Sequence, residues 1–171
     1  MRSQVSPVRV ATLCVLAGLA GAVLVHQAIA ATATGSFQVR ITIQESCAVV
    51  STNMLDFGSQ NVLTANVDQD TQLSVQCTAS TPYDIGLNAG TGAGATEAVR
   101  KMTGPGAATV SYSLYQDAGR SVLWGNTVGT NTISGTGTGA AQPYTVHGRV
   151  PPQTTPGAGT YIDTITVTVT F

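Results

Sequence analysis

Few side chains of this 171-residue sequence have the type and spacing that catalysis requires. His147 is the one histidine beyond residue 30, and it lies in a strand-like run between Val146 and Gly148. A hydrolase would also need an activated nucleophile, and the sequence has no Gly-x-Ser-x-Gly motif to present one. The pattern favours a solvated or packed strand histidine over a general base, while a triad with one of the serines remains an open alternative.

The acidic side chains do not form a catalytic or metal-binding pattern. A glycosidase needs two carboxylates opposed across a cleft, whereas those beyond residue 30 are scattered and mostly adjoin turn residues. Asp68 and Asp70 could suggest calcium, but no Asp-x-Asp-x-Asp-Gly loop follows them. The glycine-rich stretches 90–94 and 135–139 lack the Gly-Lys-Ser/Thr ending of a phosphate-binding loop. We predict no enzyme, no cofactor and no metal, and expect these stretches to be exposed hairpin loops.

The first thirty residues have the pattern of an export signal. Arg2 and Arg9 supply positive charge, residues 10–25 are uncharged and mostly apolar, and Ala28-Ile29-Ala30 provides a small-x-small cleavage site. The apolar run is shorter than the roughly 20 residues that a membrane-spanning helix needs. We therefore predict a cleaved signal peptide over residues 1–30 and a mature chain from Ala31, with no membrane span after cleavage.

The mature chain is poor in charge. It has five Lys and Arg against eight Asp and Glu, a net charge of −3. Such a chain has no basic patch with which to neutralise phosphates, so the composition argues against a nucleic-acid partner. Threonine, glycine and valine are plentiful, which suits strands and tight turns.

Cysteine usage predicts one disulfide. Cys14 lies in the signal, so Cys47 and Cys77 are the pair that reaches an oxidising compartment. A metal site is the alternative, but two isolated thiols and one histidine make a poor ligand set. Closing a loop of this size should stabilise the domain by roughly 3–4 kcal/mol.

Period-two alternation recurs along the chain, and the helical period of 3.6 appears nowhere at length. The clearest run is the last, residues 163–171, where apolar side chains alternate with threonines. Shorter runs cover residues 37–43, 73–77, 83–87, 110–114 and 144–146. Glycine and proline turn signals separate the runs at spacings of roughly 10–15 residues, which is typical of an antiparallel sandwich or barrel. The predicted fold class is all-β.

An ordered set of short motifs resembles one known family. The motifs are Ile41-x-Ile43-x-x-x-Cys47-x-Val49, Leu55-Asp56-Phe57-Gly58, Leu73-x-Val75-x-Cys77-Thr78, Pro82-Tyr83-x-Ile85-x-Leu87-Asn88-x-Gly90, Arg100-Lys101-Met102, Tyr112-x-Leu114-Tyr115-x-Asp117, Trp124-Gly125, Tyr144-Thr145-Val146-His147-Gly148-Arg149-Val150-Pro151 and Gly159-x-Tyr161-x-Asp163-Thr164. Each piece is weak alone, but their order and spacing across the mature chain resemble the spore coat protein U domain family. That family includes the subunits of archaic chaperone–usher pili.

The resemblance implies an immunoglobulin-like antiparallel β-sandwich that is incomplete because it lacks its last strand. In this family a periplasmic chaperone lends each new subunit a strand, and an outer-membrane usher then exchanges it. The replacement is the N-terminal segment of the next subunit, so like subunits polymerise head to tail. The implied layout is a donor segment over residues 31–45 and an incomplete sandwich over residues 46–171, with the family disulfide on Cys47 and Cys77.

Residues 35–44 are suited to be the donor strand. They lie near the mature N-terminus and alternate so that one face carries Phe37, Val39, Ile41 and Ile43. The alternative is an ordinary first strand paired within its own domain. On the acceptor side, we expect the C-terminal strand to border the open groove and to pair with the chaperone through Ile165, Val167, Val169 and Phe171.

The function that follows is structural. We expect a pilus subunit that is exported through the periplasm to the cell surface and supports adhesion and biofilm formation. The alternative is a spore-coat or surface-matrix protein that assembles without an usher. A sugar-binding tip adhesin with two domains would be about twice this length.

Overall fold

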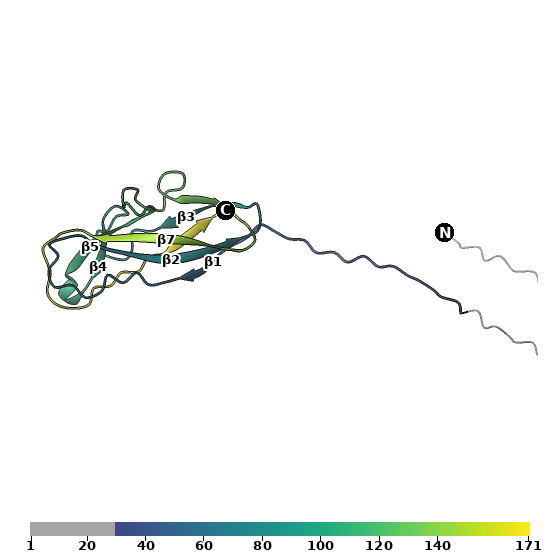
Figure 1. Ribbon diagram of the computed structural model, residues 1–171, viewed down its shortest axis with the longest axis horizontal. Helices are drawn as coiled ribbons and strands as arrows, with labels where there is room; N and C mark the ends of the chain where they lie inside the picture. Colours follow the sequence, from purple (N-terminus) through teal and green to yellow (C-terminus); the bar gives the residue numbers. More distant parts are fainter. Residues whose placement is uncertain (1–29) are drawn as a thin grey trace, which may run out of the picture. The chain divides into compact units, whose positions relative to one another are not determined.

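The computed structural model describes residues 30–171, so the predicted signal peptide lies, except for its last residue, outside the described residues. The chain divides into two units, Met1–Arg40 and Ile41–Phe171. Residues 30–46 contain no helix or strand, and all of their side chains are exposed. Sheet structure begins at Cys47, in the second unit (Figure 1). No helix of the described part is long and apolar enough to span a membrane.

The second unit is built from eight strands and one short 3-10 turn. The elements are β1 Cys47–Thr52, β2 Val67–Cys77, β3 Pro82–Leu87, β4 Arg100–Thr103, η1 Pro105–Ala107, β5 Thr109–Tyr115, β6 Ile133–Thr136, β7 Ala141–Val150 and β8 Val167–Thr170. All the strand pairs are antiparallel. The predicted all-β class is confirmed.

The strands form two sheets that share one core. The first has the order β1-β2-β7-β5-β4 and the second has the order β6-β3-β8 (Figure 1). Both sheets contribute to a single buried cluster of Leu63, Leu73, Val75, Cys77, Tyr83, Ile85, Leu87, Val110, Tyr112, Leu114, Trp124, Val146 and Val150. Period-two alternation explains the members that lie in strands, because every second side chain of a strand points to the same face. Leu63 and Trp124 join the cluster from connecting segments. The result is an antiparallel β-sandwich.

Arg100 is buried inside this sandwich with no exposed surface. Its guanidinium donates hydrogen bonds of 2.7–3.0 Å to the carbonyl oxygens of Leu87, Asn88, Glu97 and Trp124. Burial lowers the pKa of Arg100, but a guanidinium still remains charged in proteins. The side chain therefore ties together the end of β3, the segment before β4 and the backbone at Trp124.

The start of β1 is held to the end of β2 by more than ladder bonds. A disulfide joins Cys47 to Cys77, the predicted pair, which face each other in the β1–β2 register. One residue earlier the ladder continues, since the backbone N–H of Thr78 donates to the carbonyl of Ser46. The Thr78 hydroxyl also donates to the carbonyl of Gln44 and accepts from the N–H of Ser46. The backbone is therefore anchored from Gln44 onward.

Several elements differ from the sequence-based expectations. The strand predicted over residues 163–171 is confined to β8, although its burial still alternates back to Tyr161. The stretch 135–139 is not simply an exposed loop, because Gly135 lies in β6 and Gly137 is buried. A Cβ on Gly137 would lie 2.1 Å from the carbonyl oxygen of Thr78. Glycine is needed there for close packing rather than for loop mobility.

Candidate acceptor groove

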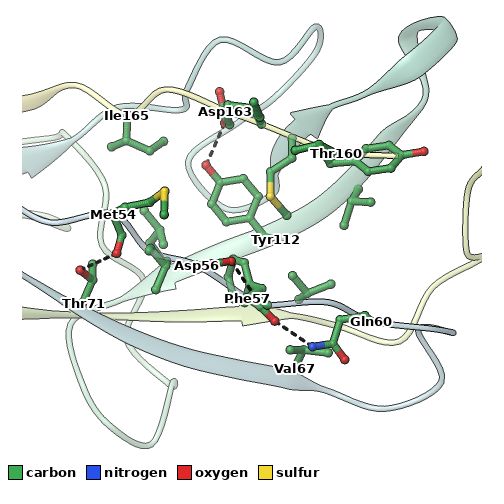
Figure 2. A pocket seen from close by; sticks show the side chains of 18 of the residues that line it. Met54, Asp56, Phe57, Gln60, Val67, Thr71, Tyr112, Thr160, Asp163 and Ile165 are labelled. Carbon is green, nitrogen blue, oxygen red and sulfur yellow. Dashed lines mark hydrogen bonds between the residues drawn. The ribbon is translucent and has the colours of Figure 1, made fainter. Parts of the chain in front are cut away.

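An open groove runs along one edge of the sandwich. It lies between the residues that follow β1, here called the first wall (residues 53–61), and those that precede β8, the second wall (residues 155–165). Its volume is about 1100 Å³, and Figure 2 shows side chains from both walls and the floor around it. β1 and β8 contact each other, and each is the last strand of its sheet. Each therefore has an edge with no partner in its own sheet.

The floor of the groove is the apolar interior of the sandwich. Both sheets supply inward-facing side chains, namely Val67, Leu73, Leu87, Met102, Val110, Tyr112, Leu114, Val146 and Val150. These residues belong to the buried core or pack against it. The groove is thus an opening into the hydrophobic core itself.

The first wall places two apolar side chains inward. Leu55 and Phe57 alternate in sequence and are half-buried, while Met54 between β1 and Leu55 is exposed. They approach β7 closely because Gly148 has no side chain, and a Cβ there would lie 2.5 Å from Leu55 Cδ2. Asp56 accepts a hydrogen bond from the N–H of Gly58, whose φ of +69° favours glycine, and this turn ends the alternation.

The second wall is pinned at one end and apolar at the other. The N–H of Leu63, two residues beyond the first wall, donates to Thr155 Oγ1 over 2.9 Å and ties the start of the second wall to this segment. At the other end Ile165 and Val167 point toward the core and line the groove. Between these ends Asp163 adds a single carboxylate to the lining.

Tyr112 crosses the floor between the two walls. Its ring packs edge-on against Phe57 with centroids 6.2 Å apart, and its hydroxyl donates to Asp163 Oδ2 over 2.8 Å (Figure 2). Burial, with the hydrogen bond to this carboxylate, raises the pKa of Tyr112 far above its usual value. The phenol therefore stays neutral and acts as a permanent hydrogen-bond donor.

The residues predicted to be the donor lie outside the sheets. Phe37, Val39, Ile41 and Ile43 are 70–86% exposed. On the acceptor side Ile165 and Val167 line the groove, Val169 packs against the core, and Phe171 is 60% exposed and does not line it.

The first wall and the two residues that cross the groove, Tyr112 and Asp163, contribute to the family motifs, but the sequence does not indicate that they meet. Leu55-Asp56-Phe57-Gly58 is one of the family motifs, and its two apolar residues alternate in sequence. Asp163 interrupts the last alternating run of the sequence, but its partners Thr91 and Tyr112 are 72 and 51 residues away in the chain. Only a three-dimensional arrangement brings these groups together.

The candidate catalytic side chains form an ion-pair cluster on the outer face of the first sheet. His147 Nδ1 lies 2.9 Å from Asp70 Oδ1, and Arg120 contacts the same oxygen at 2.6 Å. Arg149 makes two hydrogen bonds of 2.7 Å to Asp68. These groups satisfy one another, and within residues 30–171 no group of three His, Cys, Asp or Glu side chains could hold a metal ion.

The fold and the groove define an antiparallel β-sandwich with an unfilled edge. Residues 33–168 match the Spore Coat Protein U domain, and the chain belongs to this family. Protein U of Myxococcus xanthus is 36% identical over 156 residues, which cover 83% of this chain and 87% of that protein.

The same fold is found among solved structures. One of them is the crystal structure of the CsuC–CsuE chaperone–tip adhesion subunit pre-assembly complex from the archaic chaperone–usher Csu pili of Acinetobacter baumannii. The match has a TM-score of 0.54 and 22% sequence identity, and it covers 76% of this chain. The chain spans only 41% of the length of the chain that it matches there.

Proposed function

We propose that this chain is a structural subunit of an archaic chaperone–usher surface pilus whose subunits join by donor-strand exchange. The observation that carries the proposal is a pair of complementary features in one chain. The sandwich has an open apolar groove at its edge, and the leading segment has four exposed apolar side chains in alternation. The fold shared with a pilus-subunit complex supports this reading.

The shape of the groove suits a strand better than a small molecule. It is long and open, because its lining runs along both walls, from Thr52 to Asn61 and from Thr155 to Ile165. It also lies beside two edge strands, which offer unpaired backbone groups. A strand inserted here would gain ladder hydrogen bonds from these edges and place every second side chain on the apolar floor.

The donor strand comes from a second copy of the chain. To reach its own groove, the segment carrying Ile41 and Ile43 would have to reverse direction within residues 44–46. Ser46 instead continues the β1–β2 ladder through Thr78, and the carbonyl of Gln44 is bonded to the same threonine. These bonds hold the backbone in line with β1 and oppose a hairpin. Head-to-tail joining of like subunits follows.

An open groove needs a cover before assembly. An exposed apolar floor beside unpaired strand edges is prone to aggregation. In the proposed pathway residues 1–30 direct export, a periplasmic chaperone occupies the groove, and an outer-membrane usher exchanges it for residues 31–45 of the next subunit. The fibre then supports adhesion and biofilm formation at the cell surface, with no catalytic role for the chain.

The test is a charge placed on either face of the donor segment. Ile41→Lys puts an ammonium group into the apolar groove and removes an apolar contact worth roughly 1.5–3 kcal/mol, so it should stop fibre growth. Thr42→Lys adds the same charge one residue on, where an extended strand points away from the groove. Electron microscopy of cells that produce each variant with its chaperone and usher measures the outcome. Fibres of normal length from Ile41→Lys would refute the donor assignment.

A second function is favoured by one specific observation. The 36% identity to Protein U, within a family named for spore coats, fits a coat or surface-matrix protein that assembles without an usher. The two functions differ in what assembly requires. Fibres that form only when the chaperone and usher are co-produced support the pilus, whereas layers formed by purified mature chain alone support the coat.

A further inference from the structure

Part of the second wall is held by side chains instead of a strand ladder. Ile162 pairs with Thr103 of β4 in the first sheet, while the carbonyl of Thr166 accepts from Asn88 beside the second sheet. Within the described chain, the intervening residues 163–165 make no backbone–backbone hydrogen bond. The wall thus crosses from one sheet to the other at Asp163.

The Asp163 carboxylate holds this crossing. Its Oδ1 accepts hydrogen bonds from Thr91 N at 2.7 Å and Thr91 Oγ1 at 2.8 Å, and its Oδ2 accepts from the Tyr112 hydroxyl at 2.8 Å. Thr91 follows β3 of the second sheet, and Tyr112 lies in β5 of the first. One carboxylate therefore ties the wall to both sheets. Bonds to a charged acceptor are stronger than neutral ones.

The neighbouring chain is shaped to receive this carboxylate. Gly90 has a φ of +82°, and a Cβ on it would lie 2.1 Å from Asp163 Oδ2. The preceding turn is fixed by Asn88, whose Oδ1 accepts from the N–H groups of Gly90 and Thr166. Any side chain at position 90 would both strain the backbone and displace the carboxylate.

We propose that Asp163 is a positioning residue for donor uptake, which keeps the second wall in its open, strand-ready place while the groove is empty. The inference rests on the proposed function. An inserted donor would itself supply ladder bonds to residues 163–165, so the Asp163 contacts matter before insertion and little afterwards. Losing them lowers the fraction of subunits that can accept a donor, and apparent association falls by that fraction.

The experiment uses a synthetic peptide of residues 35–44 and the mature chain carrying Ile41→Lys, whose own donor cannot compete. Association and dissociation rates are measured by stopped-flow fluorescence. In this background Asp163→Ala should slow association on the order of tenfold, as expected if the second wall is open in only about one subunit in ten. The dissociation rate should stay within about twofold of the parent. Gly90→Ala should behave in the same way, because it displaces the carboxylate without removing it.

Asp163→Asn supplies the conservative comparison. An amide can still accept from Thr91 and donate to the Tyr112 oxygen, so association should stay within about threefold of the parent. Two results would overturn the positioning role. The first is a dissociation rate that rises by the same factor as the association rate falls. The second is an association rate that falls equally in Asp163→Ala and Asp163→Asn. Unchanged association in both Asp163→Ala and Gly90→Ala would also overturn it while leaving the proposed function intact. A peptide that fails to bind the parent would refute the proposed function and this inference together.

Discussion

Removing the Cys47–Cys77 disulfide should have a large effect that the structure allows us to estimate. The bridge closes a loop of 30 residues, for which the chain-entropy relation gives about 3.6 kcal/mol at 25 °C. β1 depends on this bridge more than a central strand would, because it pairs only with β2 and its residues after Cys47 are exposed. We expect the double variant Cys47→Ala/Cys77→Ala to lose roughly 2–5 kcal/mol of unfolding free energy.

Trp124 provides the assay. It is the sole tryptophan of the sequence and is fully buried, so its fluorescence reports urea-induced unfolding of the core. Ser51→Ala, an exposed change on the same strand, is the matched control and should leave the urea midpoint in place. If the double cysteine variant unfolded at the same midpoint with the same slope as the parent, the reasoning about the bridge would be wrong.

Two further changes test the polar contacts. Arg100→Met removes a buried cation and leaves four carbonyls without their donor. The free energy of unfolding measured in urea should fall by more than about 3 kcal/mol, and a loss below about 1 kcal/mol would contradict the structural role of Arg100. The hydrogen bonds from Arg149 lower the pKa of Asp68 in the folded state. The pair therefore stabilises the fold fully at pH values above the unfolded carboxyl pKa of about 3.9, and this stabilisation is lost as pH falls through the lower pKa of the folded state. Because the pair is partly exposed, the parent should be more stable than Asp68→Asn by under about 1 kcal/mol at pH 7, and the difference should vanish toward pH 2. A difference that grew on acidification would contradict the lowered pKa of Asp68.

The long alternating runs were predictable because each one carries its own signal. Leu73 and Val75 in β2, and Ile85 and Leu87 in β3, are buried where period two places them. β1, β4 and β6 were not predicted, since Cys47–Thr52 shows no alternation and the four-residue strands β4 and β6 are too short for a period to stand out. The family resemblance, not periodicity, suggested that the sandwich is open at one edge.

The groove itself depends on contacts between distant parts of the chain. Phe57, Tyr112 and Asp163 meet across it, yet local sequence shows only a turn, a strand residue and a polar interruption. The close fit of Leu55 against Gly148 depends in the same way on a glycine that looks unremarkable within the β7 pattern. Propensity describes neighbours in sequence, whereas these positions are set by packing between sheets.

The anchoring of residues 44–47 determines how the domain meets a mechanical load. A pull on the leading segment reaches Cys47 and passes covalently through the sulfur atoms to Cys77 at the end of β2. It therefore bypasses the β1 ladder, which would otherwise open one rung at a time from its first residue. β2 in turn pairs with β7 over ten consecutive positions. Tension that enters through the leading segment would thus reach β2, next to the centre of the first sheet, without first opening the β1 ladder.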